Sequence, residues 1–142
     1  MSSRYWELLW KRAKRFLVRA ERDYNEGDYD GACFNSVQAV ELATKAVIYR
    51  LFGVRVEAQG VKDLLVQLRR MFYNASEHDL VKLVDEVING CSNELELLEK
   101  IYIDGMDIEL ELSENQGKTC LKATKKILET LIRIEYSFTQ SK

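Results

Sequence analysis

The sequence predicts an all-α protein, an up-and-down bundle of about five helices that forms a single domain over residues 1–142. Three observations predict this fold. Proline is absent, although an average usage of about 5% would place roughly seven prolines in a chain of this length. Apolar residues recur at helical spacing along most of the chain. Finally, the segment between Gly27 and Gly53 is apolar around most of its girth, which is typical of a helix covered by other helices on every side.

The first two helices are predicted to be antiparallel neighbours. The first runs from about Ser3 to Asn25, and its apolar face comprises Tyr5, Leu8, Leu9, Phe16 and Ala20. A tight connection follows, in which Asp28 is placed to cap the second helix. Because this connection is so short, the two helices should lie side by side in opposite directions. The second helix ends at Gly53 and forms the spine of the domain.

Two further helices follow a brief connection. The first is predicted at residues 61–72. Ser76 and Asp79 fit the pattern of a capping box that starts the next helix. That helix should extend to about Tyr102, and Gly90 and Ser92 are positions where it can bend.

The helical pattern breaks between residues 104 and 117. Apolar and acidic residues alternate at 108–112, as in a short strand. The last helix is predicted to begin at about Glu114 or Lys118 and to end at Phe138, and residues 113–116 are suited to cap its start. No internal repeat or interdomain linker is visible.

Composition and cysteine spacing exclude several classes of site. Cys33, Cys91 and Cys120 are odd in number, far apart and in no Cys-x-x-Cys pair, which favours three reduced, buried thiols over a disulfide framework or a zinc site. The chain has one histidine, so a metal site with several histidines is excluded. We expect neither a metal nor a cofactor.

The chain also lacks the features of a membrane or secreted protein. No apolar run approaches the roughly 18 residues of a membrane span. The first six residues lack the apolar core of a secretory signal. We therefore expect a cytoplasmic protein with no membrane partner.

Charge is distributed unevenly along the chain. Residues 1–70 hold thirteen Lys and Arg against nine Asp and Glu, whereas residues 71–142 hold eight against fourteen. The acidic residues crowd segment 94–114, which lacks the spacing of a calcium loop. Such a division is found on solvated surfaces, and it also suits docking or self-association.

A narrow polar row on the second helix is the main candidate site for a nucleotide or a partner, and it consists of Asn35, Gln38, Glu41 and Lys45. Three interpretations stay open. Lys45 can meet a phosphate in a groove while Gln38 hydrogen-bonds a base or a partner backbone. Glu41 and Lys45 can instead form an i,i+4 surface pair worth about 0.2–0.5 kcal/mol. The row can also lie at a dimer seam, where polar contacts fix how two copies align.

The first helix is a second candidate surface, since basic side chains lie close to aromatic ones. Such a combination can hold a nucleic-acid backbone and stack bases, so RNA is a partner to consider. Against this, the sequence spreads the positive charges around the helix. Trp6 and Trp10 are four residues apart, so they share a face and should pack.

The order of these segments resembles the HEPN domain family (higher eukaryotes and prokaryotes nucleotide-binding), particularly its small stand-alone archaeal and bacterial members. The resemblance is carried by the basic first helix and by three segments, Gly-Asp-Tyr-Asp-Gly-Ala at 27–32, Gln-Ala-Val-Glu-Leu-Ala-Thr-Lys-Ala at 38–46 and Gly-Val-Lys-Asp-Leu-Leu at 60–65. It implies a helical bundle that commonly pairs into homodimers. It also implies a nucleotide-related role, because many such proteins are similar to companions of small nucleotidyltransferases in toxin–antitoxin pairs.

The resemblance further implies a ribonuclease alternative. Some HEPN domains are metal-independent ribonucleases that bring an arginine and a histidine together across a dimer, with four to six residues between them in the chain. A histidine can move a proton at neutral pH while an arginine steadies a phosphate. Here His78 is the sole histidine and seven residues separate it from Arg70, so His78 with Arg70 or Arg69 departs from the motif. Residues 104–107, where relatives carry an arginine-containing turn, hold no arginine. We therefore expect a binding module rather than an enzyme.

Overall fold

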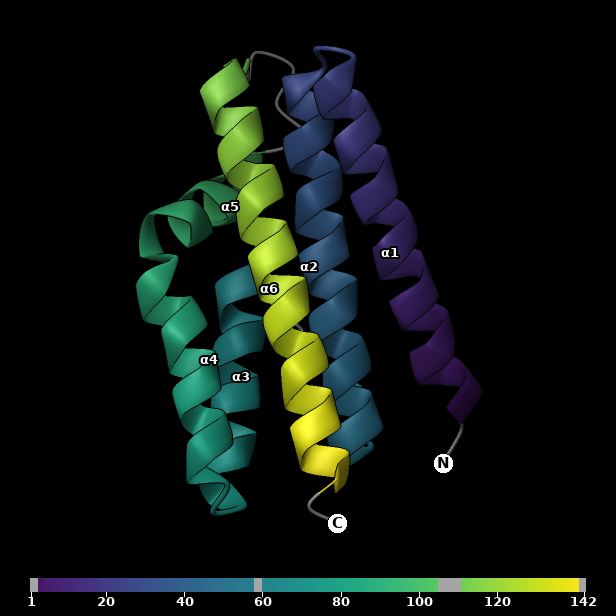
Figure 1. Ribbon diagram of the computed structural model, residues 1–142, viewed down its shortest axis with the longest axis vertical. Helices are drawn as coiled ribbons and strands as arrows, with labels where there is room; N and C mark the ends of the chain where they lie inside the picture. Colours follow the sequence, from purple (N-terminus) through teal and green to yellow (C-terminus); the bar gives the residue numbers. More distant parts are fainter. Residues whose placement is uncertain (1–2, 58–59, 105–110, 141–142) are drawn as a thin grey trace.

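The computed structural model describes residues 3–57, 60–104 and 111–140, and these residues form a bundle of six helices without strands (Figure 1). In chain order the helices are α1 (Ser3–Asn25), α2 (Tyr29–Phe52), α3 (Val61–Asn74), α4 (His78–Gly90), α5 (Ser92–Asp104) and α6 (Glu114–Gln140). The predicted all-α bundle is confirmed. The predicted count of about five is wrong, because six helices are present in the described part of the chain.

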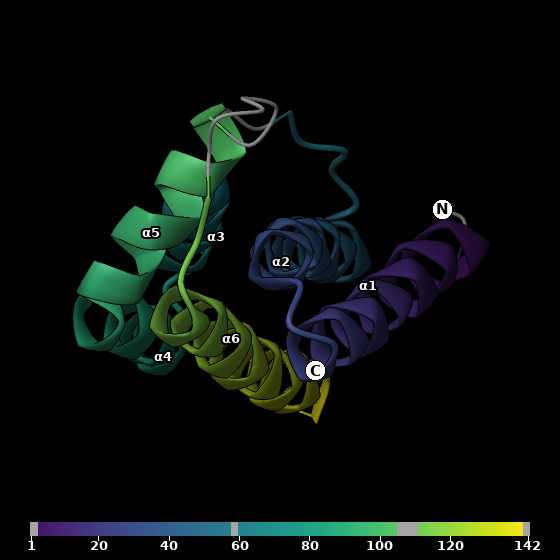
Figure 2. The same cartoon turned by 90° about the horizontal axis from the view of Figure 1, so that it is seen from above.

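The sixth helix arises where one helix was expected between residues 76 and 102. α4 ends at Gly90 and α5 begins at Ser92, with Cys91 between them at φ −117° and ψ 31°. Glycine and serine are weak helix formers, so a pair of them leaves the backbone free to change direction. α5 turns away from the axis of α4 and reaches the α2–α6 side of the bundle (Figures 1 and 2).

The predicted capping box at Ser76 is also wrong. Ser76 has φ 59° and belongs to the turn that ends α3, where its N–H donates to the Tyr73 carbonyl at 3.1 Å. The N–H of Glu77 donates to the Phe72 carbonyl at 2.9 Å, which completes a Schellman motif. α4 then begins at His78, and Glu77 makes no side-chain cap bond there.

The predicted cap at Asp28, stop at Gly53 and cap at residues 113–116 are confirmed. Asp28 Oδ1 accepts the N–H of Gly31 at 2.9 Å and caps α2. Gly53 ends α2 in the left-handed region at φ 68°, where its N–H donates to the Tyr49 carbonyl. Ser113 Oγ accepts the N–H of Gln116, while Gln116 Oε1 accepts the N–H of Ser113, so a capping box starts α6.

α2 is the buried spine that the sequence predicted. Figure 2 shows it between α1 on one side and α3 and α5 on the other, with α6 beside it. Half of its positions are buried, including Val40, Ala43 and Ile48 at 0% exposure. Burial on several sides explains why the helix is apolar around most of its girth.

The helices do not alternate strictly up and down, because α2, α3 and α6 run in the same direction. Phe52, Phe72 and Phe138, near the C-terminal ends of these helices, pack against one another with ring centroids 5.5–5.9 Å apart. α2 and α3 can be parallel because eight residues separate them. When extended, eight residues span up to about 26 Å, more than the roughly 21 Å length of α3.

The strand-like pattern at 108–112 lies mainly outside the described residues. Of that segment the structure describes Glu111 and Leu112, which belong to no helix or strand, and Leu112 is buried at 8% exposure.

Candidate functional site

The predicted polar row lies on α2 with all four side chains half-buried. Asn35 Nδ2 donates to Asp23 Oδ2 of α1 at 2.7 Å, so Asn35 helps to fasten α1 to α2. Lys45 Nζ donates to Glu41 Oε1 at 3.0 Å as an i,i+4 ion pair. Gln38 makes no hydrogen bond to another residue that the structure describes.

This geometry gives the row a definite chemical character. The carboxylate of Glu41 already balances the charge of Lys45, so a phosphate that used the remaining donors of Lys45 would lie close to a like charge. The amide of Gln38, which bonds no other described residue, offers donors and an acceptor to a peptide backbone or a base. The row therefore suits polar recognition better than the binding of a highly charged ligand.

Arg69 holds α3 to α4. Its Nε lies 2.5 Å from Asp85 Oδ1 and its Nη2 lies 3.2 Å from Asp85 Oδ2, a bidentate arrangement. The hydrogen bond to Asp85, and then the attraction between the opposite charges, raises the pKa of Arg69 above its ordinary value. Arg69 is therefore engaged in a structural ion pair.

His78 and Arg70 lie on either side of the α3–α4 turn. His78 is the exposed first residue of α4, and its ring lies edge-on to that of Tyr73 at a centroid distance of 6.0 Å. Arg70 is exposed near the end of α3. Neither residue forms an ion pair with a described residue.

The positive charge of α1 is less dispersed than its sequence suggested. Five basic side chains, Lys11, Lys14, Arg15, Arg19 and Arg22, line one shallow hollow together with Val18. All five are exposed, and their spacing places them along about three turns of one helix face. We call these five residues the basic face of α1. The interpretation that the charges spread around the helix is therefore wrong for these five.

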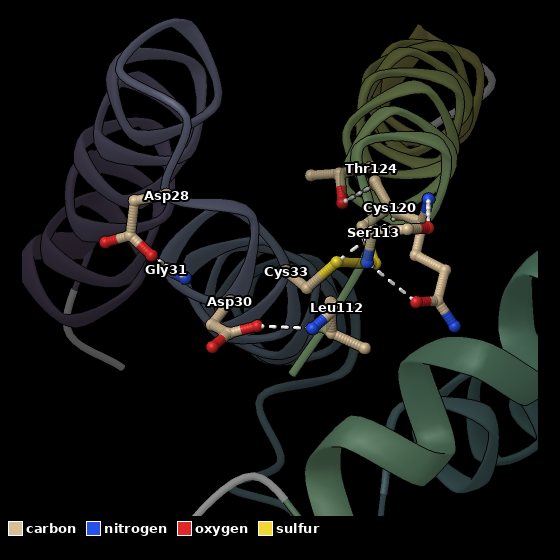
Figure 3. Close-up of a disulfide and its surroundings, with 9 residues drawn as sticks. Asp28, Asp30, Gly31, Cys33, Leu112, Ser113, Cys120 and Thr124 are labelled. Carbon is tan, nitrogen blue, oxygen red and sulfur yellow. Dashed lines mark hydrogen bonds between the residues drawn. A yellow bond between two sulfur atoms is a disulfide. The ribbon is translucent and has the colours of Figure 1, made fainter. Parts of the chain in front are cut away.

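Cys33 and Cys120 form a disulfide that joins α2 to α6 (Figure 3), with their Cα atoms 5.3 Å apart. The prediction of three reduced thiols is therefore wrong, and Cys91 is the one free cysteine. The prediction failed because 87 residues separate the pair in sequence. The parallel course of α2 and α6 brings their N-terminal ends together, which cysteine spacing alone does not reveal.

Further contacts close this end of the bundle around the disulfide. Asp30 Oδ1 accepts the N–H of Leu112 at 2.7 Å (Figure 3). Gly117 packs so closely on Tyr29 that an added Cβ would lie 3.0 Å from that ring. The segment leading into α6 is thus held against the start of α2.

A groove lies at the opposite end, between α1, α2 and α6. It has a volume of about 190 Å³ and is lined by Trp6, Trp10, Ala46, Val47, Arg50, Leu131, Ile132 and Glu135. We call it the tryptophan groove. The sequence predicted that Trp6 and Trp10 share a face, and this is confirmed, but it gave no sign that α2 and α6 complete a groove with them.

Two polar features distinguish the tryptophan groove from ordinary core. Arg50 Nε lies 3.5 Å from Glu135 Oε1, and the Arg50 guanidinium lies 5.0 Å from the Trp6 ring centroid. The Trp6 Nε1 atom is buried without a hydrogen-bond partner among the described residues. Buried polar groups are normally paired, so this atom is an exception, as is Ser36 Oγ in the described part of the chain.

Two further searches concern metals and membranes. Within the described ranges, no three or more His, Cys, Asp or Glu side chains converge as a metal site requires. None of the helices in those ranges combines the length and apolar character needed to cross a membrane.

Comparison with known proteins gives one family match. The family model described as HEPN domain matches residues 6–134 of the chain. The chain has no significant match among curated proteins or solved structures.

Proposed function

The chain belongs to the HEPN domain family, and from this premise we propose that it is a homodimeric interaction module rather than a ribonuclease. Its companion is a small nucleotidyltransferase, as in toxin–antitoxin pairs of this kind. The proposal includes recognition of a nucleotide or of the partner chain through the polar row on α2.

The observation that carries the proposal is the ion pair between Arg69 of α3 and Asp85 of α4. A ribonuclease of this family needs an arginine free to meet a phosphate beside a histidine. Arg69 is instead held by both carboxylate oxygens of Asp85. His78 presents its exposed ring to Tyr73, and seven residues separate it from Arg70.

The polar row supports the binding part of the proposal. Gln38 is half-buried with its amide unsatisfied by described residues, and the Glu41–Lys45 pair beside it carries no net charge. A neutral, half-buried polar strip favours hydrogen bonds to a protein backbone or to a base over capture of a bare phosphate.

Incubation of purified protein with structured RNA, beside His78→Ala and Arg70→Ala variants, tests the absence of ribonuclease activity. We expect no cleavage above background from any of them. Cleavage by the wild-type protein that both substitutions abolish would overturn the proposal and establish the ribonuclease alternative.

If a small nucleotidyltransferase is encoded next to this chain, co-expression of the two proteins tests the proposed partner. We expect a stable complex, and we expect Gln38→Ala to weaken it at least fivefold. Gln67→Ala, which changes an amide on α3 that bonds Asp63 and the Glu57 carbonyl, is the matched control and should leave the complex unchanged. Calorimetry with ATP and GTP on the same variants distinguishes nucleotide binding from partner binding.

A further inference from the structure

The tryptophan groove continues into exposed apolar surface. Ile132 is 52% exposed and Tyr136 is 64% exposed, and they lie one turn apart on the same side of α6. Ile132 also lines the groove. An apolar groove next to protruding apolar side chains is a frequent sign of a protein–protein contact.

The groove is poorly suited to a small molecule. Its volume of about 190 Å³ lies below the 300–1,000 Å³ that is usual for ligand pockets. A small molecule inside it would also leave Tyr136 exposed, since Tyr136 does not line it. A folded partner can fill the groove and cover both apolar side chains.

Charge identifies the partner. The groove carries one cation, Arg50, and one anion, Glu135, with side chains 42% and 30% exposed. A patch with one charge of each sign complements itself across a two-fold axis, because each charge can then face its opposite on the other copy. The basic face of α1 has no such property, because two copies of it would repel each other.

The surrounding surface is large enough for such a contact. α1 has 23 residues and α6 has 27, so they are roughly 35 and 40 Å long. A strip two helices wide, at about 10 Å per helix, offers close to the roughly 800 Å² per partner of a standard interface.

We propose that the tryptophan groove is the face through which two copies of this chain pair, with Ile132 and Tyr136 of one copy packed against the groove of the other. Arg50 of each protomer then lies opposite Glu135 of its partner. This inference rests on the homodimer of the proposed function and assigns its interface.

Light scattering on size-exclusion fractions tests the interface with two matched variants. Ile132→Asp places a charge in the proposed contact, and Ile103→Asp places the same charge on α5, where Ile103 is 72% exposed. We expect the wild-type protein and Ile103→Asp to be dimeric. Ile132→Asp should raise the dissociation constant at least tenfold with an unchanged circular dichroism spectrum.

A charge-reversal mixture separates contacts between copies from the Arg50–Glu135 contact within one copy. R50E alone and E135R alone place like charges together in every dimer, so each should dimerise at least fivefold more weakly than wild type. In a mixed dimer of the two variants, every reversed charge faces an opposite charge across the two-fold axis. Mixing should therefore restore a dimer, although within each chain the like charges remain together.

Three outcomes overturn the inference. A wild-type dimer unaffected by Ile132→Asp, or a mixture of R50E and E135R that does not recover, would show that the copies pair elsewhere while leaving the homodimer intact. A wild-type protein that stays monomeric at high concentration would overturn both this inference and the homodimer of the proposed function.

Discussion

At the end of the bundle where α2 and α6 begin, the two helices are joined by the Cys33–Cys120 disulfide, and side-chain caps satisfy the first turn of each helix. At the end where they finish, side-chain contacts between described residues hold them together. Phe52, Phe72 and Phe138 pack together there, and Arg50 approaches Glu135 at 3.5 Å.

The two ends differ in covalent closure and in the apolar surface that they expose. The disulfide end buries Leu112 under the connection to α6, and Ser36 Oγ, one turn along α2 from Cys33, is buried there without a hydrogen-bond partner among the described residues. The other end leaves Ile132 and Tyr136 exposed and the Trp6 indole N–H without a partner among described residues. A disulfide and helix caps stabilise the end where α2 and α6 begin, whereas the end where they finish exposes apolar side chains. The second end is therefore the better candidate for binding another protein.

Removal of the disulfide should have the largest effect. We expect Cys33→Ala combined with Cys120→Ala to lower the free energy of unfolding by about 4.5 kcal/mol in the chain-entropy model, because the bond closes a loop of 87 residues. Urea unfolding of oxidised wild type and of the double variant measures this difference. A reductant should lower the wild-type midpoint and leave that of the variant unchanged; three reactive thiols in unfolded wild type without reductant would contradict the assignment.

Phe72→Ala should cost nearly as much at the opposite end. Phe72 is fully buried between two other phenylalanines, and such a truncation destabilises by about 4 kcal/mol. Residues 33 and 52 lie about 28 Å apart along α2, so the loss should add to that from the disulfide within about 0.5 kcal/mol. Urea unfolding of the triple variant checks this, and a departure above about 1 kcal/mol would mean that the two ends are coupled.

Asp30→Ala should have a smaller, local effect. Its carboxylate accepts the Leu112 N–H at 2.7 Å, and loss of one such bond costs about 1 kcal/mol. Hydrogen exchange should then show faster exchange of the Leu112 amide. Glu129→Ala, an exposed change on α6, is the control, and equal exchange in both variants would exclude a role for Asp30.

The smallest effect concerns Cys91, the free thiol. Burial, and to a lesser degree the nearby Glu94 carboxylate, raises its pKa. Less thiolate is therefore present at pH 8 than in an unhindered cysteine, so alkylation should be slower in the folded than in the unfolded chain and should accelerate as pH rises. Glu94→Gln should increase the folded-state rate modestly, and a rate equal to that of the unfolded chain would contradict the shift.

Features that depend on nearby residues were predictable from the sequence. The ends of α1, the cap at Asp28 and the stop at Gly53 follow from local backbone chemistry. The buried character of α2 follows from its continuous apolar surface. Family membership followed from residues on and around that same helix.

Features that depend on packing were not predictable. Two weak helix formers at Gly90 and Ser92 permit either a bend or a break, and contacts with α2 and α6 decide for the break. The disulfide depends on α2 and α6 running parallel. The tryptophan groove is formed by three helices. The sequence indicated only the α1 side of it, where Trp6 and Trp10 share a face. The roles of Gln38 and Lys45 stay predictions, since nothing in the fold tests them.

Tryptophan fluorescence tests the central claim most directly, because the two tryptophans of the chain, Trp6 and Trp10, both line the groove. If two copies pair through this face, dilution of the wild-type protein should shift its emission to longer wavelength as the dimer dissociates. Ile132→Asp should show the same shift at a concentration at least about ten times higher, in line with its weaker dimer. An emission maximum that stays constant while light scattering reports dissociation over the same range would contradict the account.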